Sequence, residues 1–165
     1  MGADALLAGP APVLTSVVRA SALAGRDEVA AIGVDVVCVP RMSQLISEGG
    51  QAFLQRSWTS HELADVGDDT ERLATRWAAK EAVMKCLGLG ISDLDPHDIE
   101  IVSSESGAPS AVLRDSAAER ARSLGIAKFH VSASHESGWA VAIAVASKVT
   151  EQDDSEVSVQ GEEGS

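Results

Sequence analysis

The sequence predicts a single α+β domain in which helices pack against a mainly antiparallel sheet. A run rich in β-branched residues at 30–39 predicts a strand, and an amphipathic stretch at 70–90 predicts a helix. Near the end of the chain, two strand-like runs within 128–149 flank a turn that contains glycine, which is typical of a hairpin. Helices and strands of this kind must bury their apolar faces against one another, and 165 residues are enough for one core.

The domain is expected to open with a strand followed by a helix. The run AAIGVDVVCV at 30–39 is apolar enough to predict a buried strand, which Pro40 ends. A helix is expected to begin at Arg41 and Met42 and to continue through Leu45 and Ile46. The clearest helix of the chain then covers 70–90, and Gly88 is a suitable end for it. Its apolar stripe consists of Leu73, Trp77, Val83, Met84 and Leu87.

The second half is expected to hold two pairs of strands with a helix between them. The segment 99–115 (IEIVSSESGAPSAVLRD) predicts two strands around a Ser-Gly-Ala-Pro turn. The segment SAAERARSLG predicts a helix that ends at Gly125. The closing hairpin at 128–149 is expected to turn at Ser134–Gly138 and to finish in a strongly apolar strand.

Composition divides the chain into three regions. Residues 1–28 form an N-terminal extension of unknown role, and 29–149 form the patterned domain. Residues 150–165 form an acidic tail that we expect to be disordered, because it lacks large apolar side chains. The net charge is −12, and residues 151–165 hold six acids and no base, so half of the excess lies in this tail. No basic face is indicated, which argues against nucleic acid as a partner.

Other classes of protein are also disfavoured. No apolar run approaches the roughly 20 residues needed to span a bilayer, so we expect no membrane segment. The first residues lack the basic segment of a secretory signal, and we expect a cytoplasmic protein. Cys38 and Cys86 form no CxxC pair and are expected to be free thiols.

Carboxylates and lysines in two of the predicted elements indicate a cation site. Asp35 interrupts the apolar strand, where a carboxylate is costly unless it is paired or binds a cation. Glu81 and Lys85 lie four residues apart on one helix face. Taken singly, Asp35 could be a surface acid and Glu81–Lys85 an ordinary surface pair. Taken together, two carboxylates beside lysines that bind phosphate match what Mg²⁺ prefers in proteins.

The adjacent Ser134 and His135 are a weaker signal. Neighbouring residues in a hairpin do not form the geometry of a nucleophile and its base, and the chain has no G-x-S-x-G motif. A histidine in a turn is often merely exposed, so these two residues do not indicate a hydrolase.

Three runs of the chain, taken in order, resemble a known family. The runs IGVDVVCVPRM (32–42), RWAAKEAVMKCLG (76–88) and VSASHESGWAVAIAVA (131–146) are similar to the three signature blocks of 4'-phosphopantetheinyl transferases. The resemblance covers about residues 31–146 and is to the small, single-lobed holo-(acyl carrier protein) synthase type. Larger, two-lobed members carry a second acid where this chain has Val37, and small members are typically trimers.

The resemblance implies an Mg²⁺-dependent enzyme that transfers phosphopantetheine from coenzyme A to a serine of an acidic acyl carrier protein. It implies that Asp35 and Glu81 bind the metal, and that either Glu81 or Asp35 acting through water serves as general base. It also implies that Lys80 and Lys85 contact phosphate and that Lys85 aids departure of the nucleotide. Near the adenosine bisphosphate, the resemblance places Arg76, Ser134 and His135. Arg41 and Arg56 are implied to dock the carrier protein. The alternative is a homologue that binds carrier proteins without catalysis.

Overall fold

The computed structural model describes residues 28–104 and 107–148. The expected N-terminal extension up to residue 27 and the expected acidic tail lie outside the described residues. The described part confirms the predicted α+β class, with helices on antiparallel sheets. The elements, in chain order, are β1 (Glu28–Cys38), α2 (Val39–Ser57), α3 (Ser60–Val66), α4 (Thr70–Cys86), the 3-10 helix η1 (Pro96–Asp98), β2 (Ile99–Ser103), β3 (Pro109–Leu113), α5 (Asp115–Ser123), β4 (Lys128–Glu136) and β5 (Trp139–Lys148).

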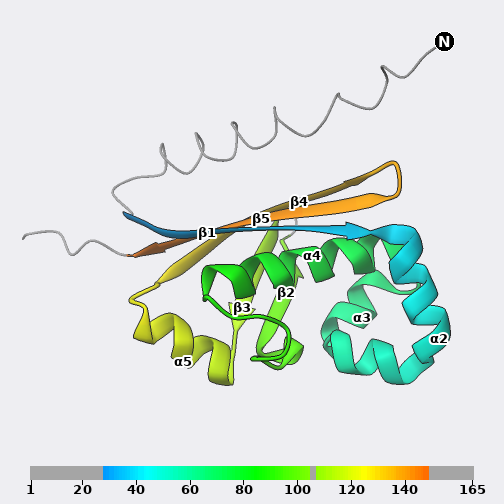
Figure 1. Cartoon of the computed structure of the whole chain (residues 1–165), viewed down its shortest axis with the longest axis horizontal. Helices are drawn as coiled ribbons and strands as arrows, with labels where there is room; N and C mark the ends of the chain where they lie inside the picture. Colours follow the sequence, from blue (N-terminus) through cyan, green and yellow to red (C-terminus); the bar gives the residue numbers. More distant parts are fainter. Residues whose placement is uncertain (1–27, 105–106, 149–165) are drawn as a thin grey trace, which may run out of the picture.

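Helix α4 packs on the inner face of a three-stranded antiparallel sheet with the order β1-β5-β4 (Figure 1). Its close approach is possible because the sheet presents small side chains at the contact. A Cβ atom added to Gly33 of β1 would lie 1.9 Å from the carbonyl oxygen of Ala82, so this position tolerates glycine alone. The alanines 140, 142, 144 and 146 of β5 are all buried beneath the helix. The second sheet, β2-β3, lies on the same side as the helices.

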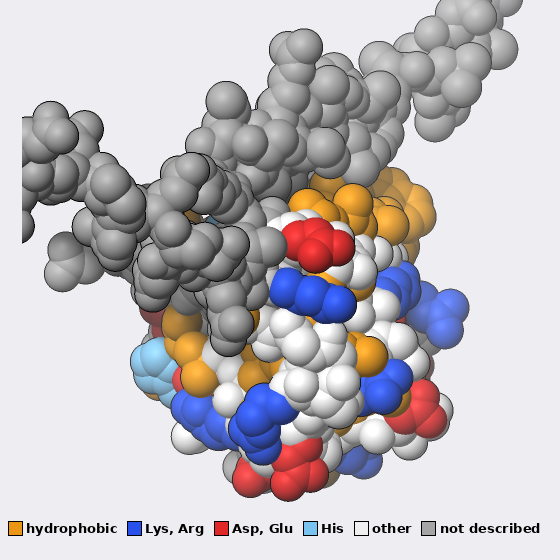
Figure 2. All heavy atoms as spheres, turned by 90° about the vertical axis from the view of Figure 1, so that its left-hand side faces the viewer, with side chains coloured by type: hydrophobic (Ala, Val, Ile, Leu, Met, Phe, Trp, Pro, Cys, Tyr) orange, Lys and Arg blue, Asp and Glu red, His pale blue; other side chains and the backbone are white. Residues whose placement is uncertain are grey.

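The outer face of the β1-β5-β4 sheet differs from the sequence prediction. Ile32, Val34 and Val36 alternate with inward-facing Gly33 and Asp35, and each of these three apolar side chains is about half exposed. The prediction of a fully buried first strand is therefore wrong for this face. All the described helices lie on the other side of the sheet (Figure 1), and hydrophobic side chains gather at the sheet side of the molecule (Figure 2).

The helix boundaries follow from local capping. Strand β1 ends at Cys38, and Pro40 lies in the first turn of α2. The N–H groups of a first turn have no partner within the helix, so the missing N–H of proline is not needed there. Helix α3 was not predicted from the pattern; Thr59 and Glu62 form a capping box that starts it. The predicted end of α4 is confirmed, since Gly88 has φ 69°, a left-handed conformation that favours glycine. No described helix is both long and apolar enough to cross a membrane.

The closing hairpin is confirmed, but its turn is shorter than predicted. Strand β4 continues to Glu136, and only Ser137 and Gly138 remain for the turn, both with positive φ as a two-residue hairpin requires. His135 therefore lies in a strand opposite Ala140. The apolar strand β5 is central in its sheet, and its side chains are mostly buried, apart from Trp139 at its start.

Candidate active site on both sides of helix α4

One group of polar side chains lies where α4 faces β1. Asp35 points inward from β1, and its Oδ1 accepts a hydrogen bond from Lys85 Nζ at 2.8 Å. The same ammonium donates to the carbonyl oxygen of Val34 at 2.7 Å. The Lys85 side chain is 48% exposed while that of Asp35 is 13% exposed, so the pair is open on the lysine side. The structure thus brings two of the predicted site residues together.

Glu81 completes this group. Partial burial raises the pKa of Glu81, and the nearby carboxylate of Asp35 raises it further, while a hydrogen bond with Trp77 and the charge of Lys85 oppose the shift. When both carboxylates are ionised, the group of Asp35, Glu81 and Lys85 carries a net charge of −1. Such a donor set fits a hard divalent cation that also binds substrate phosphates. Among the described residues there is no cluster of three or more His, Cys, Asp or Glu that could hold a metal without such help.

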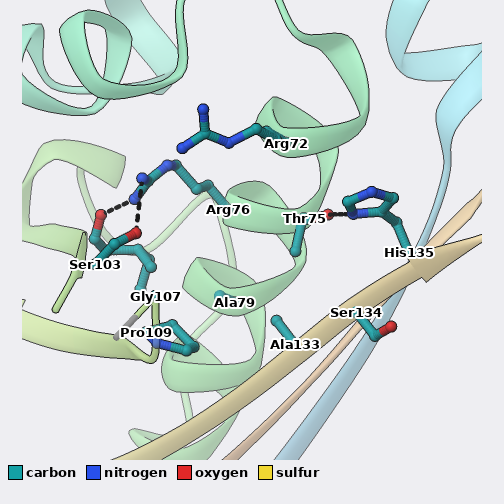
Figure 3. Close-up of a pocket in the computed structure, with 11 residues that line it drawn as sticks. Arg72, Thr75, Arg76, Ala79, Ser103, Gly107, Pro109, Ala133, Ser134 and His135 are labelled. Atoms are coloured by element: carbon teal, nitrogen blue, oxygen red, sulfur yellow. Dashed lines mark hydrogen bonds between the residues drawn. The ribbon is translucent and has the colours of Figure 1, made fainter. Parts of the chain in front are cut away.

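A cleft lies on the other side of α4, between this helix and strands β3 and β4 (Figure 3). It has a volume of about 400 Å³. His135 projects from β4 across its mouth, with Nδ1 3.2 Å from Thr75 Oγ1 and Nε2 3.6 Å from Glu71 Oε2. Ser134 lies beside it. The lining residues are Arg72, Thr75, Arg76, Ala79, Ile101, Ser103, Gly107, Pro109, Ala133, Ser134 and His135.

Arg76 lies at the back of this cleft and is held by the protein itself. Its guanidinium donates to the carbonyl oxygen of Ile101 and pairs with Asp65, and it lies 3.2 Å from Ser103 Oγ. Arg72 lies nearer the solvent and also approaches Asp65, at 3.6 Å, with its side chain 43% exposed. Arg72, Arg76 and His135 line the cleft, whereas the acids that approach them, Asp65 and Glu71, are not part of its lining. The lining itself therefore suits an anion.

The structure does not bring Lys80 to either group. Its side chain is buried and pairs with Glu62 of α3. Burial lowers the pKa of Lys80, although Glu62 opposes this shift. The expected contact of Lys80 with phosphate gains no support from this position, because the ammonium faces the protein interior.

The two basic residues expected at the carrier-protein surface lie on α2. Arg41 is in its first turns and Arg56 in its last turn, and both are exposed. Neither arginine lines the cleft. Helix α2 directly follows β1, the strand that holds Asp35.

A single copy of the chain keeps the two polar groups apart. Asp35 belongs to one edge strand of the sheet, β1, and His135 to the other, β4. Along α4, Thr75 and Ala79 point to the cleft while Glu81 and Lys85 point to β1. At about 100° per residue, these two sets point in directions about 120° apart around the helix axis. The predicted site residues therefore form two half-sites rather than one.

Comparison with known proteins identifies the family. Residues 31–144 match the model of the 4'-phosphopantetheinyl transferase superfamily, which is well over half of the chain. The chain belongs to the 4'-phosphopantetheinyl transferase superfamily. The matched range contains Asp35, Glu81, Lys85 and His135.

Relatives within the superfamily are similar in sequence and structure. The holo-[acyl-carrier-protein] synthase of Herpetosiphon aurantiacus is 38% identical over 120 residues, covering 68% of this chain and 94% of the relative. The Helicobacter pylori synthase, solved in complex with coenzyme A, superimposes with a TM-score of 0.64 at 31% identity, covering 70% of this chain and 98% of that one. The Plasmodium yoelii acyl carrier protein synthase with ADP bound gives a TM-score of 0.70 at 28% identity, covering 76% and 100%.

Sequence reasoning missed several residues of this superfamily member's cleft. Arg72 and Thr75 stand one turn before Arg76 and Ala79, and helical spacing alone would have placed them on the same face. Asp65 gave no signal, because its role depends on how α3 packs beside α4. Glu62, the partner of Lys80, is part of a recognisable sequence pattern, the capping box Thr59-x-x-Glu62. This pattern predicts the start of a helix but not an ion pair.

Proposed function

We propose that this chain transfers the 4'-phosphopantetheine arm of coenzyme A to a serine of an apo-acyl carrier protein, giving holo-carrier protein and adenosine 3',5'-bisphosphate. The observation that carries this proposal is the Asp35–Lys85–Glu81 group inside the matched family range. The relatives' names and the coenzyme A complex of one of them support it. Whether the carrier serves fatty acid, polyketide or peptide synthesis depends on which carrier proteins it accepts. A cytoplasmic location is part of the same proposal.

Asp35 and Glu81 would hold the Mg²⁺. Each offers carboxylate oxygens. Burial raises the pKa of Glu81 and the charge of Asp35 raises it further, and a cation between the two carboxylates would offset both effects. When bound, Mg²⁺ neutralises the pyrophosphate of coenzyme A and lowers the charge against which the serine attacks.

In the transfer, the serine oxygen of the carrier protein forms a bond to the β-phosphorus, the one joined to pantetheine. The bond from that phosphorus to the bridging oxygen breaks, and adenosine 3',5'-bisphosphate leaves with the electron pair. Lys85 is the exposed cation at this place and would stabilise the charge on the departing phosphate. The serine proton goes to Glu81, or to Asp35 through a water molecule.

The nucleotide half of coenzyme A would bind in the cleft. Its phosphates need cations and donors, and the cleft offers Arg76 and His135, with Ser134 at its rim. Arg72 adds a partly exposed guanidinium to this set. Lys80 is left out of the proposed phosphate ligands, because its partners are protein groups.

The carrier protein would dock along α2. Arg41 and Arg56 are exposed basic residues on a chain whose net charge is −12, so they offer local positive charge to an acidic partner. Charges of this kind act mainly on encounter and register.

A complete site would need two copies of the chain, and we propose a homotrimer. The β1 side of α4 in one copy would meet the cleft of its neighbour, so that Asp35, Glu81 and Lys85 face Arg76 and His135 across the contact. Two observations support this: the half-sites are separated within one copy, and Ile32, Val34 and Val36 form an exposed apolar row on β1. A repeated head-to-tail contact closes into a ring, and three copies give three equivalent sites.

Mass spectrometry of apo-carrier proteins tests the proposal. Incubation with coenzyme A and Mg²⁺ should add the mass of one phosphopantetheine group to the carrier serine, and chelation of the metal should prevent the addition. A homologue that binds carrier proteins without catalysis would leave the mass unchanged while still forming a complex. That alternative is not favoured, because Asp35, Glu81, Lys85 and His135 are all present. No mass addition across a panel of carrier proteins would contradict the proposal.

A further inference from the structure

The ion pair of Lys80 and Glu62 is completely enclosed. Lys80 Nζ lies 2.7 Å from Glu62 Oε2, and both side chains are 0% exposed. The ammonium also donates to the carbonyl oxygens of Ser57, at 3.1 Å, and Pro96, at 2.8 Å. These three acceptors equal the number of N–H donors of a lysine, so none is left for a substrate phosphate.

The carboxylate of Glu62 is satisfied in the same way. Its Oε1 accepts from the amide of Ile101 at 3.0 Å, and its Oε2 accepts from the amide of Thr59 at 2.9 Å. The pair therefore joins the end of α2, the start of α3, η1 and β2 to a single turn of α4.

A second contact runs parallel to this one, a turn earlier on α4. Arg76 pairs with Asp65, which follows Glu62 by three residues on α3, and donates to the carbonyl oxygen of Ile101. Both backbone groups of Ile101 are thus bound by side chains. The Arg76 contact holds the cleft, and its partners Asp65 and Ile101 are not among the partners of Lys80.

We propose that Lys80 and Glu62 are positioning residues, which hold the turn of α4 that carries Glu81 so that Glu81 faces Asp35. Lys80 and Glu81 are successive residues about 100° apart on this turn. A shift of the turn that displaced Lys80 from its three acceptors would move Glu81 with it, while Arg76, one turn earlier, has separate partners. The inference rests on the proposed function, because the direction of Glu81 matters for transfer only if Glu81 serves it.

A buried ion pair suits this role better than an apolar contact does. Apolar side chains of similar volume often stabilise a fold as well as a buried pair, so stability alone does not explain the pair. Directional hydrogen bonds to fixed acceptors define the position of this turn of α4, whereas an apolar contact of the same volume defines it less closely. Removing both charges together should therefore keep the fold and lose the alignment.

The test compares the double variant Glu62→Gln/Lys80→Met with the two single variants and the wild type. Glu119→Gln/Lys128→Met, which removes the same charges from exposed positions, is the matched control. Circular dichroism gives the folded fraction, transfer to an apo-carrier protein gives kcat and KM for coenzyme A, and calorimetry gives the affinity for adenosine 3',5'-bisphosphate. Should the double variant not fold, Glu62→Asp keeps both charges and still displaces Lys80.

In the double variant, kcat per folded molecule should fall about tenfold or more, the usual cost of losing a group that orients a metal ligand. The KM for coenzyme A and the nucleotide affinity should stay within about threefold, because the Arg76 contact remains. The single variants should lose at least as much as the double, since the two residues act as a unit. Glu62→Asp should lower kcat less, again with KM unchanged.

Two results would overturn the inference. A tenfold loss of affinity for the nucleotide with kcat unchanged would make Lys80 a phosphate ligand after all. If the double variant has the same kcat per folded molecule as the wild type, the Lys80–Glu62 pair serves only the stability of the fold. A wild-type protein that transfers nothing would instead contradict the proposed function, and the calorimetric measurement would still report on Lys80.

Discussion

The two sides of α4 carry opposite charge on one helix. Toward β1, Asp35 and Glu81 outnumber Lys85, and the surplus is negative. Toward β4, the lining of the cleft holds two arginines and no acid, while Asp65 and Glu71 lie outside the lining. A phosphorylated substrate with a divalent cation needs both kinds of surface. The helix, which is about 10 Å across, separates them within one copy. Within one copy, each side of α4 therefore offers only one of the two kinds of surface. Under the proposed assembly, a second copy would supply the other.

Loss of a carboxylate on the β1 side should have the largest effect. Asp35→Asn or Glu81→Gln removes one of the two proposed Mg²⁺ ligands, and transfer should fall by about two orders of magnitude or more. The folded fraction should not change. Steady-state rates at several Mg²⁺ concentrations check this. Turnover near that of the wild type would remove the β1 side from the site.

A change on the cleft side should act on binding rather than on chemistry. Arg72→Gln should raise the KM for coenzyme A about tenfold, since one charge-assisted hydrogen bond to phosphate is worth roughly 1.5 kcal/mol or more. Its kcat should stay nearly constant. Arg122→Gln, an exposed arginine on α5, is the control. If kcat falls and KM does not, the assignment of the cleft to nucleotide binding is wrong.

Helix α2 should respond to the other substrate. Arg41→Glu or Arg56→Glu should raise the KM for the carrier protein severalfold and leave that for coenzyme A nearly unchanged, because exposed charges steer an acidic partner. Added salt should weaken the wild type in the same direction. Equal effects on both substrates would place these arginines with the nucleotide.

The smallest effect should be on stability in the absence of metal. The pKa of Glu81 is raised in the folded protein, so its ionisation destabilises the fold increasingly as pH rises from 4.5 through the raised value. Glu81→Gln removes this cost. In EDTA, the variant should melt a few degrees above the wild type at pH 7, and the gain should vanish below pH 4.5. Glu119→Gln, which lies on the exposed side of α5, should show no such gain.

Strong local patterns made most of the fold predictable. The stripe of α4 and the stop at Gly88 were read correctly, as was the strand pair around the Ser-Gly-Ala-Pro turn. Exposure of the outer face of β1 was not predictable, because Ile32, Val34 and Val36 give the same apolar signal whether or not a neighbour covers them. The predicted hairpin turn, Ser134–Gly138, is too long, because a two-residue turn requires a positive φ at Ser137, a conformation that serine rarely adopts.

The site was predictable in part. The spacing of Glu81 and Lys85 along one helix, with Asp35 in a strand, was enough to indicate a group that the structure does bring together. The sequence could not show which lysine of α4 is buried and which is exposed, because Lys80 and Lys85 both lie close to Glu81 on the same charged helix. Lys80 faces α3 and Lys85 faces β1, and only packing decides which ammonium stays open to solvent.

Complementation tests most directly whether the two sides of α4 form one site. Glu81→Gln disables the β1 side and His135→Ala the cleft side, so each variant should be poorly active alone. When the two are co-expressed with different tags and purified together, some contacts join an intact β1 side to an intact cleft. The mixed assemblies should therefore regain part of the wild-type activity. Clear defects in both variants with no recovery in the mixture, or a monomer by light scattering, would contradict a shared site.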